Sequence, residues 1–267
     1  QVRESAAQLL RTAKECGIAI FLVGHVTKDG TVAGPKILEH MVDVVLFFEG
    51  ESGSSLRILH GQKNRFGSTN EIAVFEMDGA GLHEVLNPSE LLLSGRPIGA
   101  SGSVVSCGME GTRPLLIEIQ GLLVASAFNL PRRTANGIDY NRLNLLIAIV
   151  EKRLNLEIGK YDAYVNITGG LRIAEPSMDL AVIMALISSY MNIEIPEDVM
   201  IFGEVGLSGE VRAVSNADQR IEEAARLGFH KIVLPAFHMK KLRQPNLTAC
   251  ELVPVRSIRE AVKILKK

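Results

Sequence analysis

Two cationic side chains, Lys63 and Arg65, stand two residues apart in a polar stretch of the sequence. The apolar segments on either side, 56–60 and 72–77, have the pattern of strands, so the stretch 61–67 between them is predicted to be a loop on which both cations project together. Arginine offers a bidentate fork and lysine a point charge, and the two together suit a phosphate group. A solvated basic turn is an equally good interpretation of the spacing alone.

Ser177 is a second candidate for chemistry, because the stretch 175–179 resembles the serine motif of Lon-type proteases. In those enzymes a lysine of lowered pKa is the base for the serine. The stretch 203–211 resembles the strand pair before that lysine, and counting on from it places the lysine position at Asp218. A carboxylate cannot form the Ser–Lys pair, and Arg220 nearby stays protonated. The protease site is therefore predicted to be degenerate, with Ser177 satisfying free N–H groups in the first turn of a helix.

The composition limits the kinds of protein that this chain can be. Its 267 residues, 47% of them apolar, allow one large core or two ordinary ones. A net charge of −1 means that any binding to nucleic acid or membrane depends on a local patch, and no apolar run is long enough for a transmembrane span. The absence of Trp, with 5% aromatic residues, argues against a single-strand binder built as a stacking platform. Three distant cysteines exclude a disulfide scaffold and a CxxC zinc site, so no metal site is expected and a reducing compartment fits.

The periodicity of apolar residues divides the chain into two parts at Asn87–Pro88. The first part is predicted to hold a helix that Gly17 ends, a strand at 18–23 covered on both faces, a long loop at 24–40 and three strands, as in half of an α/β domain. The second part is predicted to be a complete α+β domain. Its expected elements are strands at 103–107, 115–124, 161–167, 201–205, 211–214, 231–234 and 252–255, helices at 140–154 (capped by Asp139), 175–190, 216–227, 237–242 and 258–265, and a basic loop at 131–137.

The sequence FLVGHVTKDGTVAGPKILEHMVDVVLFFEG, followed by LHGQKNRFGSTNEIAVFEM, resembles the bacterial RadA (Sms) family of DNA-repair and recombination proteins. The resemblance covers essentially the whole chain. It implies part of a RecA-like P-loop ATPase core (α/β) at 1–86, a linker at 87–98 and an α+β Lon-protease-like domain at 99–267. The signature that carries it is Lys63-Asn64-Arg65-Phe66-Gly67.

The resemblance also implies what the whole protein does. Members of this family carry a four-cysteine zinc finger, hydrolyse ATP with Mg²⁺, form hexameric rings on single-stranded and branched DNA, and drive branch migration beside the RecA recombinase in the cytoplasm. This chain begins at Gln1 on the helix expected after the Walker B acid, and it contains no GxxxxGK[ST] loop. We therefore expect a DNA-dependent, helicase-like ATP hydrolase as the parent protein, and no ATP hydrolysis by this chain alone.

The resemblance assigns roles to particular residues of the first part. Lys63 and Arg65 would reach the phosphates of ATP on a neighbouring subunit and stabilise the charge of the transition state. His25 would occupy a sensor position. The loop 24–40 would face the channel of the ring, with Lys28 and Lys36 near DNA phosphates.

The second domain has its own candidate contacts with DNA. Arg132, Arg133 and Arg142 are locally basic and are predicted to form a patch that touches duplex DNA, although a solvated loop and helix face explains them slightly better. Two alternatives remain open for this domain: an assembly scaffold for the ring without DNA contact, and an active Lon-type Ser–Lys peptidase, which Asp218 disfavours.

Overall fold

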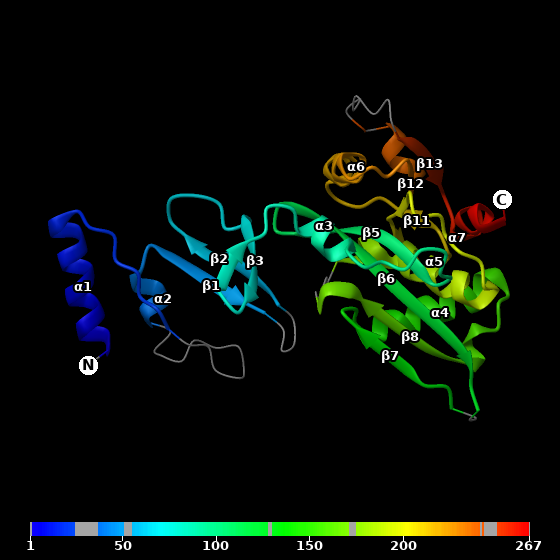
Figure 1. Cartoon of the computed structure of the whole chain (residues 1–267), viewed down its shortest axis with the longest axis horizontal. Helices are drawn as coiled ribbons and strands as arrows, with labels where there is room; N and C mark the ends of the chain where they lie inside the picture. The colour runs from blue at the N-terminus through cyan, green and yellow to red at the C-terminus, as the bar shows by residue number, and fades with distance from the viewer. Residues whose placement is uncertain are drawn as a thin grey trace.

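The computed structural model describes residues 2–24, 37–50, 55–127, 130–170, 175–240, 242 and 250–266. Two parts follow one another along the length of the molecule (Figure 1). Helix α1 (Val2–Cys16) lies at one end beside a small sheet, and the larger domain, with the C-terminus, lies at the other. The chain is thus a mixed α/β protein, as expected at that level.

The beginning of the chain departs from the prediction at residues 18–23. Helix α1 forms as expected and Gly17 ends it at a φ of +65°. The following segment is not a strand, and Phe21 and Val23 are 85% and 95% exposed. The prediction of a buried strand was wrong because a strand needs a hydrogen-bonded neighbour, and no described strand pairs with this segment.

A four-stranded antiparallel sheet forms the body of the first part. Its strands follow chain order, and the predicted strands are present, while the last strand and the short helix α2 (Ile37–Met41) were not predicted. The second strand continues through Asn64, so Lys63 lies in a strand and only the end of the predicted loop is a loop. The strands are β1 (Val44–Glu49), β2 (Leu56–Asn64), β3 (Ile72–Asp78) and β4 (Gly81–Glu84).

The second part is built on a seven-stranded mixed sheet. It contains β5 (Ser103–Glu110), β6 (Arg113–Ala125), β7 (Arg133–Asn136), β8 (Tyr161–Ile167), β9 (Val199–Ile201), β12 (Lys231–Pro235) and β13 (Glu251–Val255). The strand order is β13-β12-β9-β5-β6-β8-β7. Only the β5–β6 and β6–β8 pairs are antiparallel. A separate pair joins β10 (Glu204–Val205) to β11 (Val211–Arg212). Strand β7 lies inside the predicted basic loop, so that prediction was wrong for its last residues.

Helices cover both faces of this sheet. The long helices α4 (Tyr140–Leu154) and α5 (Asp179–Met191) pack on one face, and α6 (Ala217–Arg226) packs with Phe202 and Leu116 on the other. Asp139 Oδ1 accepts the main-chain N–H of Arg142 at 2.8 Å, which confirms the predicted cap. The chain closes with α7 (Ile258–Ala261) and a 3₁₀ turn, and a further 3₁₀ turn, Pro176–Met178, precedes α5.

The predicted linker contains a helix that belongs to the second domain. Helix α3 (Pro88–Leu93) lies along β6, and Leu92 joins the main core. Ser89 is fully buried, donates to Glu223 Oε1 at 2.7 Å and accepts the N–H of Leu116 at 3.1 Å. These contacts anchor the segment, so the expectation of a linker over its first half was wrong.

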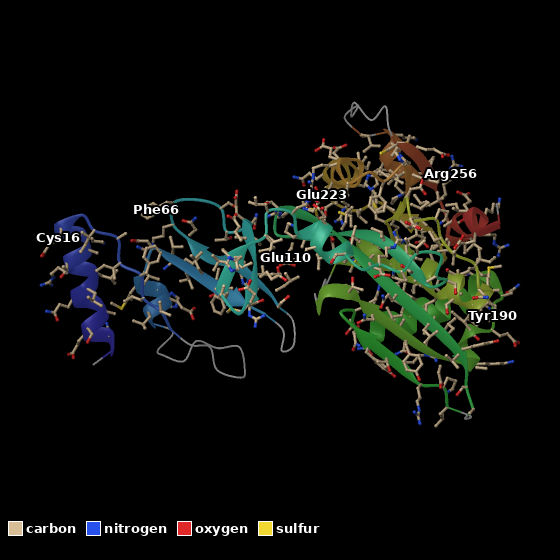
Figure 2. All side chains as sticks on the ribbon, in the orientation of Figure 1. Cys16, Phe66, Glu110, Tyr190, Glu223 and Arg256 are labelled. Carbon is tan, nitrogen blue, oxygen red and sulfur yellow. The ribbon has the colours of Figure 1, made fainter. Side chains whose placement is uncertain are left out.

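The tip of the β5–β6 hairpin joins the two parts. The N–H of Thr112 donates to the carbonyl of Asn70 at 2.8 Å. Gly111 has a φ of +60°, and a Cβ there would lie 2.0 Å from that same carbonyl oxygen, so only glycine fits. Figure 2 labels Glu110 at this junction, where burial raises the pKa of its carboxyl group. Leu56 and Val74 of the small sheet belong to the same buried apolar cluster as the core of the second domain.

None of the helices in the described ranges has the length and apolar character that crossing a bilayer requires.

Candidate functional site

Lys63 holds the end of helix α2. Its ammonium group donates to the carbonyl oxygens of Glu39 at 2.7 Å, His40 at 3.2 Å and Val42 at 2.8 Å. The last carbonyls of a helix lack partners within the helix, and an ammonium group has three protons to donate. In this conformation Lys63 donates all three protons and so connects β2 to the end of α2.

Arg65 lies at the surface beside the same helix end. Its guanidinium group donates to Asp43 Oδ1 at 3.1 Å and to the carbonyl of His40 at 3.3 Å. The side chains of Arg65 and Asp43 are 49% and 40% exposed, and an ion pair in such a position contributes about 0–1 kcal/mol. Arg65 can therefore exchange Asp43 for another anion at little cost in stability.

The rest of the signature forms a tight turn. Asn64 Oδ1 accepts the N–H of Phe66 at 3.0 Å, and its Nδ2 donates to the carbonyl of Ser68 at 3.2 Å. A Cβ at Gly67 would lie 3.1 Å from Asn64 Nδ2, which favours glycine there. Phe66 is 82% exposed (Figure 2). Asn64 thus fixes the backbone that carries Arg65 and Phe66.

Three predicted site residues of the first part, His25, Lys28 and Lys36, lie outside the described residues. Their predicted roles as sensor and as DNA contacts stay predictions.

Two of the three arginines of the predicted DNA patch are bound within the protein. Arg133 donates to the carbonyls of Tyr161 and Gly159, the latter at 2.7 Å. Arg142 pairs with Asp179 through Nε at 2.9 Å and through a second, shorter hydrogen bond. Arg132 is exposed. The structure therefore does not bring the three guanidinium groups together as one surface patch.

The Arg142–Asp179 pair joins three elements of the second domain. Asp179 is 3% exposed and also accepts the N–H of Val205 at 3.0 Å, so it links α4, α5 and β10. The hydrogen bonds that Arg142 donates to Asp179 raise the pKa of Arg142 further. Breaking a buried pair of this kind leaves an uncompensated charge.

A buried arginine, Arg220, lies beside Ser177. Arg220 is fully buried and donates to Ser177 Oγ at 3.1 Å, to Glu175 Oε2 at 2.6 Å and to the carbonyl of Ser215 at 3.0 Å, with a fourth bond to the carbonyl of Cys107. Arginine does not lose its proton in proteins, so it cannot activate the serine. The expected role of Ser177 was wrong in detail: its hydroxyl accepts from Arg220, and no side chain caps the following turn or α5.

Ser177 and Cys107, which both contact Arg220, are buried. Ser177 is 1% exposed, and burial raises the pKa of the Cys107 thiol to about 12. Glu175 Oε1 accepts the N–H of Met109 at 2.6 Å, which ties this cluster to β5. Within the described part of the chain Asp218 Oδ1 is buried without a hydrogen bond, so Asp218 does not join the cluster. The ion pair between Glu175 and Arg220 was not predicted, although the two residues lie close in sequence to Ser177 and Asp218.

Comparisons with known proteins agree with the resemblance seen in the sequence. The family model described as subunit ChlI of Mg-chelatase matches residues 143–238. The DNA repair protein RadA of Halalkalibacterium halodurans is 48% identical over 99% of this chain, and that of Bacillus subtilis 50% identical over 98%; the chain covers 57% of each. The RadA of Brucella abortus is 53% identical over 88% of the chain, which covers 50% of that relative.

These matches define the class first: the chain has a mixed α/β fold and is similar over nearly its whole length to bacterial proteins named as DNA-repair proteins. More particularly, it belongs to the family of the bacterial DNA repair protein RadA, which confirms the resemblance. The chain spans little more than half the length of the curated relatives that it matches.

Proposed function

We propose that this chain is part of a DNA-dependent ATPase that acts in DNA repair and recombination, and that it supplies a cation to ATP bound by a neighbouring subunit. The first part would belong to a RecA-like core. ATP and Mg²⁺ would be held by the nucleotide-binding loop of the whole protein, and Zn²⁺ by its finger. Neither motif occurs in these 267 residues.

The observation that carries this proposal is the placement of Arg65. It stands at the surface on a turn that Asn64 fixes, and its partner Asp43 is an exposed carboxylate. A guanidinium group that is held in place and easily released from its partner suits a phosphate oxygen in a transition state. Lys63 would fix the turn on α2 in this conformation. A direct contact of Lys63 with phosphate, which the resemblance implies, requires that it leave its three carbonyl partners.

The test uses the full-length protein with Arg65→Ala, and Arg3→Ala on the exposed face of α1 as the matched control. Removal of an arginine that acts on a neighbour's ATP lowers the hydrolysis rate by about a thousandfold or more. Mixing Arg65→Ala with a variant disabled in its nucleotide-binding loop should restore part of the activity, since each supplies what the other lacks. Hydrolysis at the parental rate by Arg65→Ala alone overturns the proposal.

For the second domain we propose a Lon-protease-like scaffold that contacts DNA or neighbouring subunits and does not cleave peptides. The buried Arg220 in contact with Ser177 supports this proposal, since no base is available to the serine. A serine-reactive fluorophosphonate should leave the chain unlabelled, and casein should stay intact. Labelling that disappears in Ser177→Ala would favour the peptidase instead.

The assembly and partners of the whole protein are also proposals. The resemblance implies a hexameric ring in the cytoplasm, on single-stranded or branched DNA and beside the RecA recombinase. The names of the relatives as DNA-repair proteins support the contact with DNA alone. Sedimentation of the full-length protein with ATP and DNA tests the ring, and a monomer under those conditions would contradict it.

A further inference from the structure

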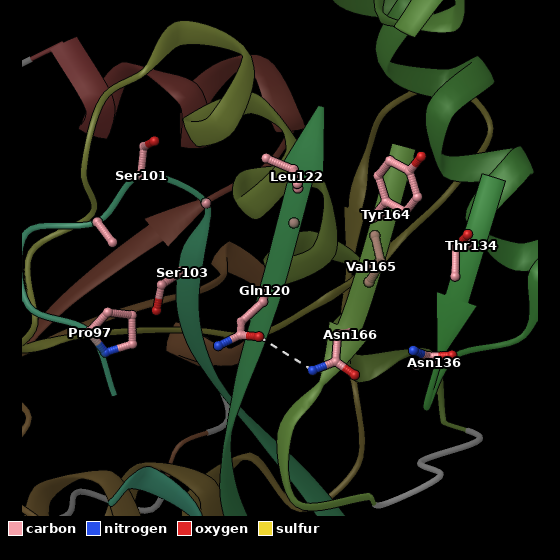
Figure 3. A pocket seen from close by; sticks show the side chains of 13 residues that line it. Pro97, Ser101, Ser103, Gln120, Leu122, Thr134, Asn136, Tyr164, Val165 and Asn166 are labelled. Carbon is pink, nitrogen blue, oxygen red and sulfur yellow. Dashed lines mark hydrogen bonds between the residues drawn. The ribbon is translucent and has the colours of Figure 1, made fainter. Parts of the chain in front are cut away.

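A cavity of about 390 Å³ lies on the sheet of the second domain, over β6, β8 and β7 (Figure 3). It occupies the face away from α5, because a Cβ at Gly121 would meet Ala185 on the opposite face and neighbouring residues of a strand alternate. Pro97 and Ser101 form its wall beside the start of β5. The volume lies within the usual range for small-molecule sites.

Three amide side chains form a row across the cavity. The strand register places Gln120 of β6 beside Asn166 of β8, and Asn166 beside Asn136 of β7. Gln120 Oε1 accepts from Asn166 Nδ2 at 3.3 Å, as the dashed line in Figure 3 shows. Among the residues that the structure describes, the amide nitrogen of Gln120, the carbonyl of Asn166 and both groups of Asn136 have no side-chain hydrogen bond. Donors and acceptors therefore alternate along this row.

The next row offers an apolar surface. Leu122, Tyr164 and Thr134 lie side by side in the register, and Leu122 is 53% exposed. The residues that line the cavity carry no charge. Such a site has no group to neutralise a phosphate or a carboxylate. It matches a neutral planar group with donors and acceptors on its edge, and Asn and Gln read nucleobase edges in this way.

An exposed cation, Arg132, lies directly before strand β7, which borders the cavity. Arg132 precedes Thr134 by two residues, or about 7 Å along an extended strand. The N–H of Arg132 donates to Asp162 Oδ1 at 2.7 Å, and Asp162 shares a face with Tyr164 by alternation. A neutral pocket suits a base, and an exposed arginine at this spacing suits the phosphate of the same nucleotide. A peptide needs no such cation, so one nucleotide fits this arrangement better.

We infer that this cavity is a site for one unpaired nucleotide of a DNA strand: the amide row would bind the edge of the base, Tyr164 its face, and Arg132 the phosphate. This inference rests on the proposed DNA association of the chain and adds the place of contact. One ring and one row of amides accommodate a single base, which agrees with the low aromatic content of the sequence.

The experiment measures binding of the full chain to two fluorescein-labelled 12-mer single strands by fluorescence anisotropy. One strand carries bases and the other has abasic residues on the same phosphate backbone. The parent should bind the base-containing strand roughly tenfold more tightly. Gln120→Ala should reduce this preference, Gln120→Ala combined with Asn136→Ala should reduce it further, and both should leave abasic binding unchanged. Tyr164→Phe should keep most of the preference because it keeps the ring.

Arg132→Ala should weaken binding to both strands alike and reduce the salt dependence of binding by about one phosphate contact. Gln8→Ala, on the exposed face of α1, is the matched control and should bind as the parent does, and thermal melting of each variant checks folding. If the parent binds DNA and the cavity variants keep its base preference, the nucleotide site is wrong while the DNA proposal stands. No binding by the parent overturns both. If an uncharged tripeptide binds in the cavity and DNA does not compete with it, the cavity is a site for a protein partner.

Discussion

Arg65 of the first part and Arg220 of the second domain have opposite surroundings. In the first part Arg65 meets a single, half-exposed carboxylate at the surface, next to a turn that holds it in place. In the second domain Arg220 is fully buried and makes hydrogen bonds to four different residues. The same side chain is thus available to a ligand in one part and part of the core in the other. Burial, and not residue type, separates an arginine that a ligand can reach from one that belongs to the core.

The largest effect is expected from Arg220→Met. It leaves Glu175 without its charge partner and Ser177 without its donor, and removal of one partner of a buried pair costs about 3–5 kcal/mol. The midpoint of thermal unfolding should fall by roughly 10 °C, as measured by calorimetry. Combining Arg220→Met with Glu175→Leu should recover part of the loss, since no unpaired charge then remains. A midpoint within about 1 °C of the parent for Arg220→Met alone would contradict the comparison.

Asp179→Asn should have the next largest effect. Arg142, which is 30% exposed, would lose its ion pair but could reach water, so the expected loss is about 2 kcal/mol in the free energy of urea unfolding. Asp218→Asn is the control in the same domain, because Asp218 Oδ1 has no hydrogen bond in the described part of the chain and its loss removes none. Equal losses for the two variants would show that the Arg142 pair contributes nothing.

Lys63→Ala should cost less, about 1–2 kcal/mol, because three main-chain carbonyls at the end of α2 lose a charged donor but lie near solvent. Hydrogen exchange of the amides in α2 and β2 should accelerate, while that of α5 should not change. Arg65→Ala is the paired variant and should change stability by less than about 1 kcal/mol. If Arg65→Ala destabilises the protein more than Lys63→Ala does, then Arg65 has the structural role and the assignment of that role to Lys63 is wrong.

The smallest effect concerns the junction between the two parts. Burial raises the pKa of Glu110 above its usual value of 4.5, so the folded chain holds this proton more tightly than the unfolded chain does. Stability is therefore lost as the pH rises through the folded pKa, and Glu110→Gln avoids that loss. The variant should be the more stable protein at pH 7, and its advantage should vanish below pH 4.5. Urea unfolding at pH 4 and pH 7 measures this, and a constant difference between the two pH values would count against it.

Local signals were enough for most helices and strands. The helix 140–154 was predicted correctly because both its apolar spacing and its cap, Asp139, lie within a few residues of one another. The strand at 161–167 was correct for the same kind of reason. The segment 18–23 failed because its apolar run specifies burial only when neighbouring strands cover it. Helix α3 failed because its burial depends on Leu116 and Glu223, far along the chain.

The candidate sites show the same difference between features that are local in the sequence and features that depend on distant residues. Membership of the RadA family, the signature around Arg65 and the missing base for Ser177 follow from the order of residues alone. The roles of Lys63 and Arg220 do not follow from it. The partners of Lys63 lie 21–24 residues away in the sequence, and those of Arg220 lie up to 113 residues away. The row of Gln120, Asn166 and Asn136 likewise exists only through strand register. Sequence by itself determined which chemical groups the chain carries. Tertiary structure decided which of them meet water, since burial and register are collective properties of residues distant along the chain.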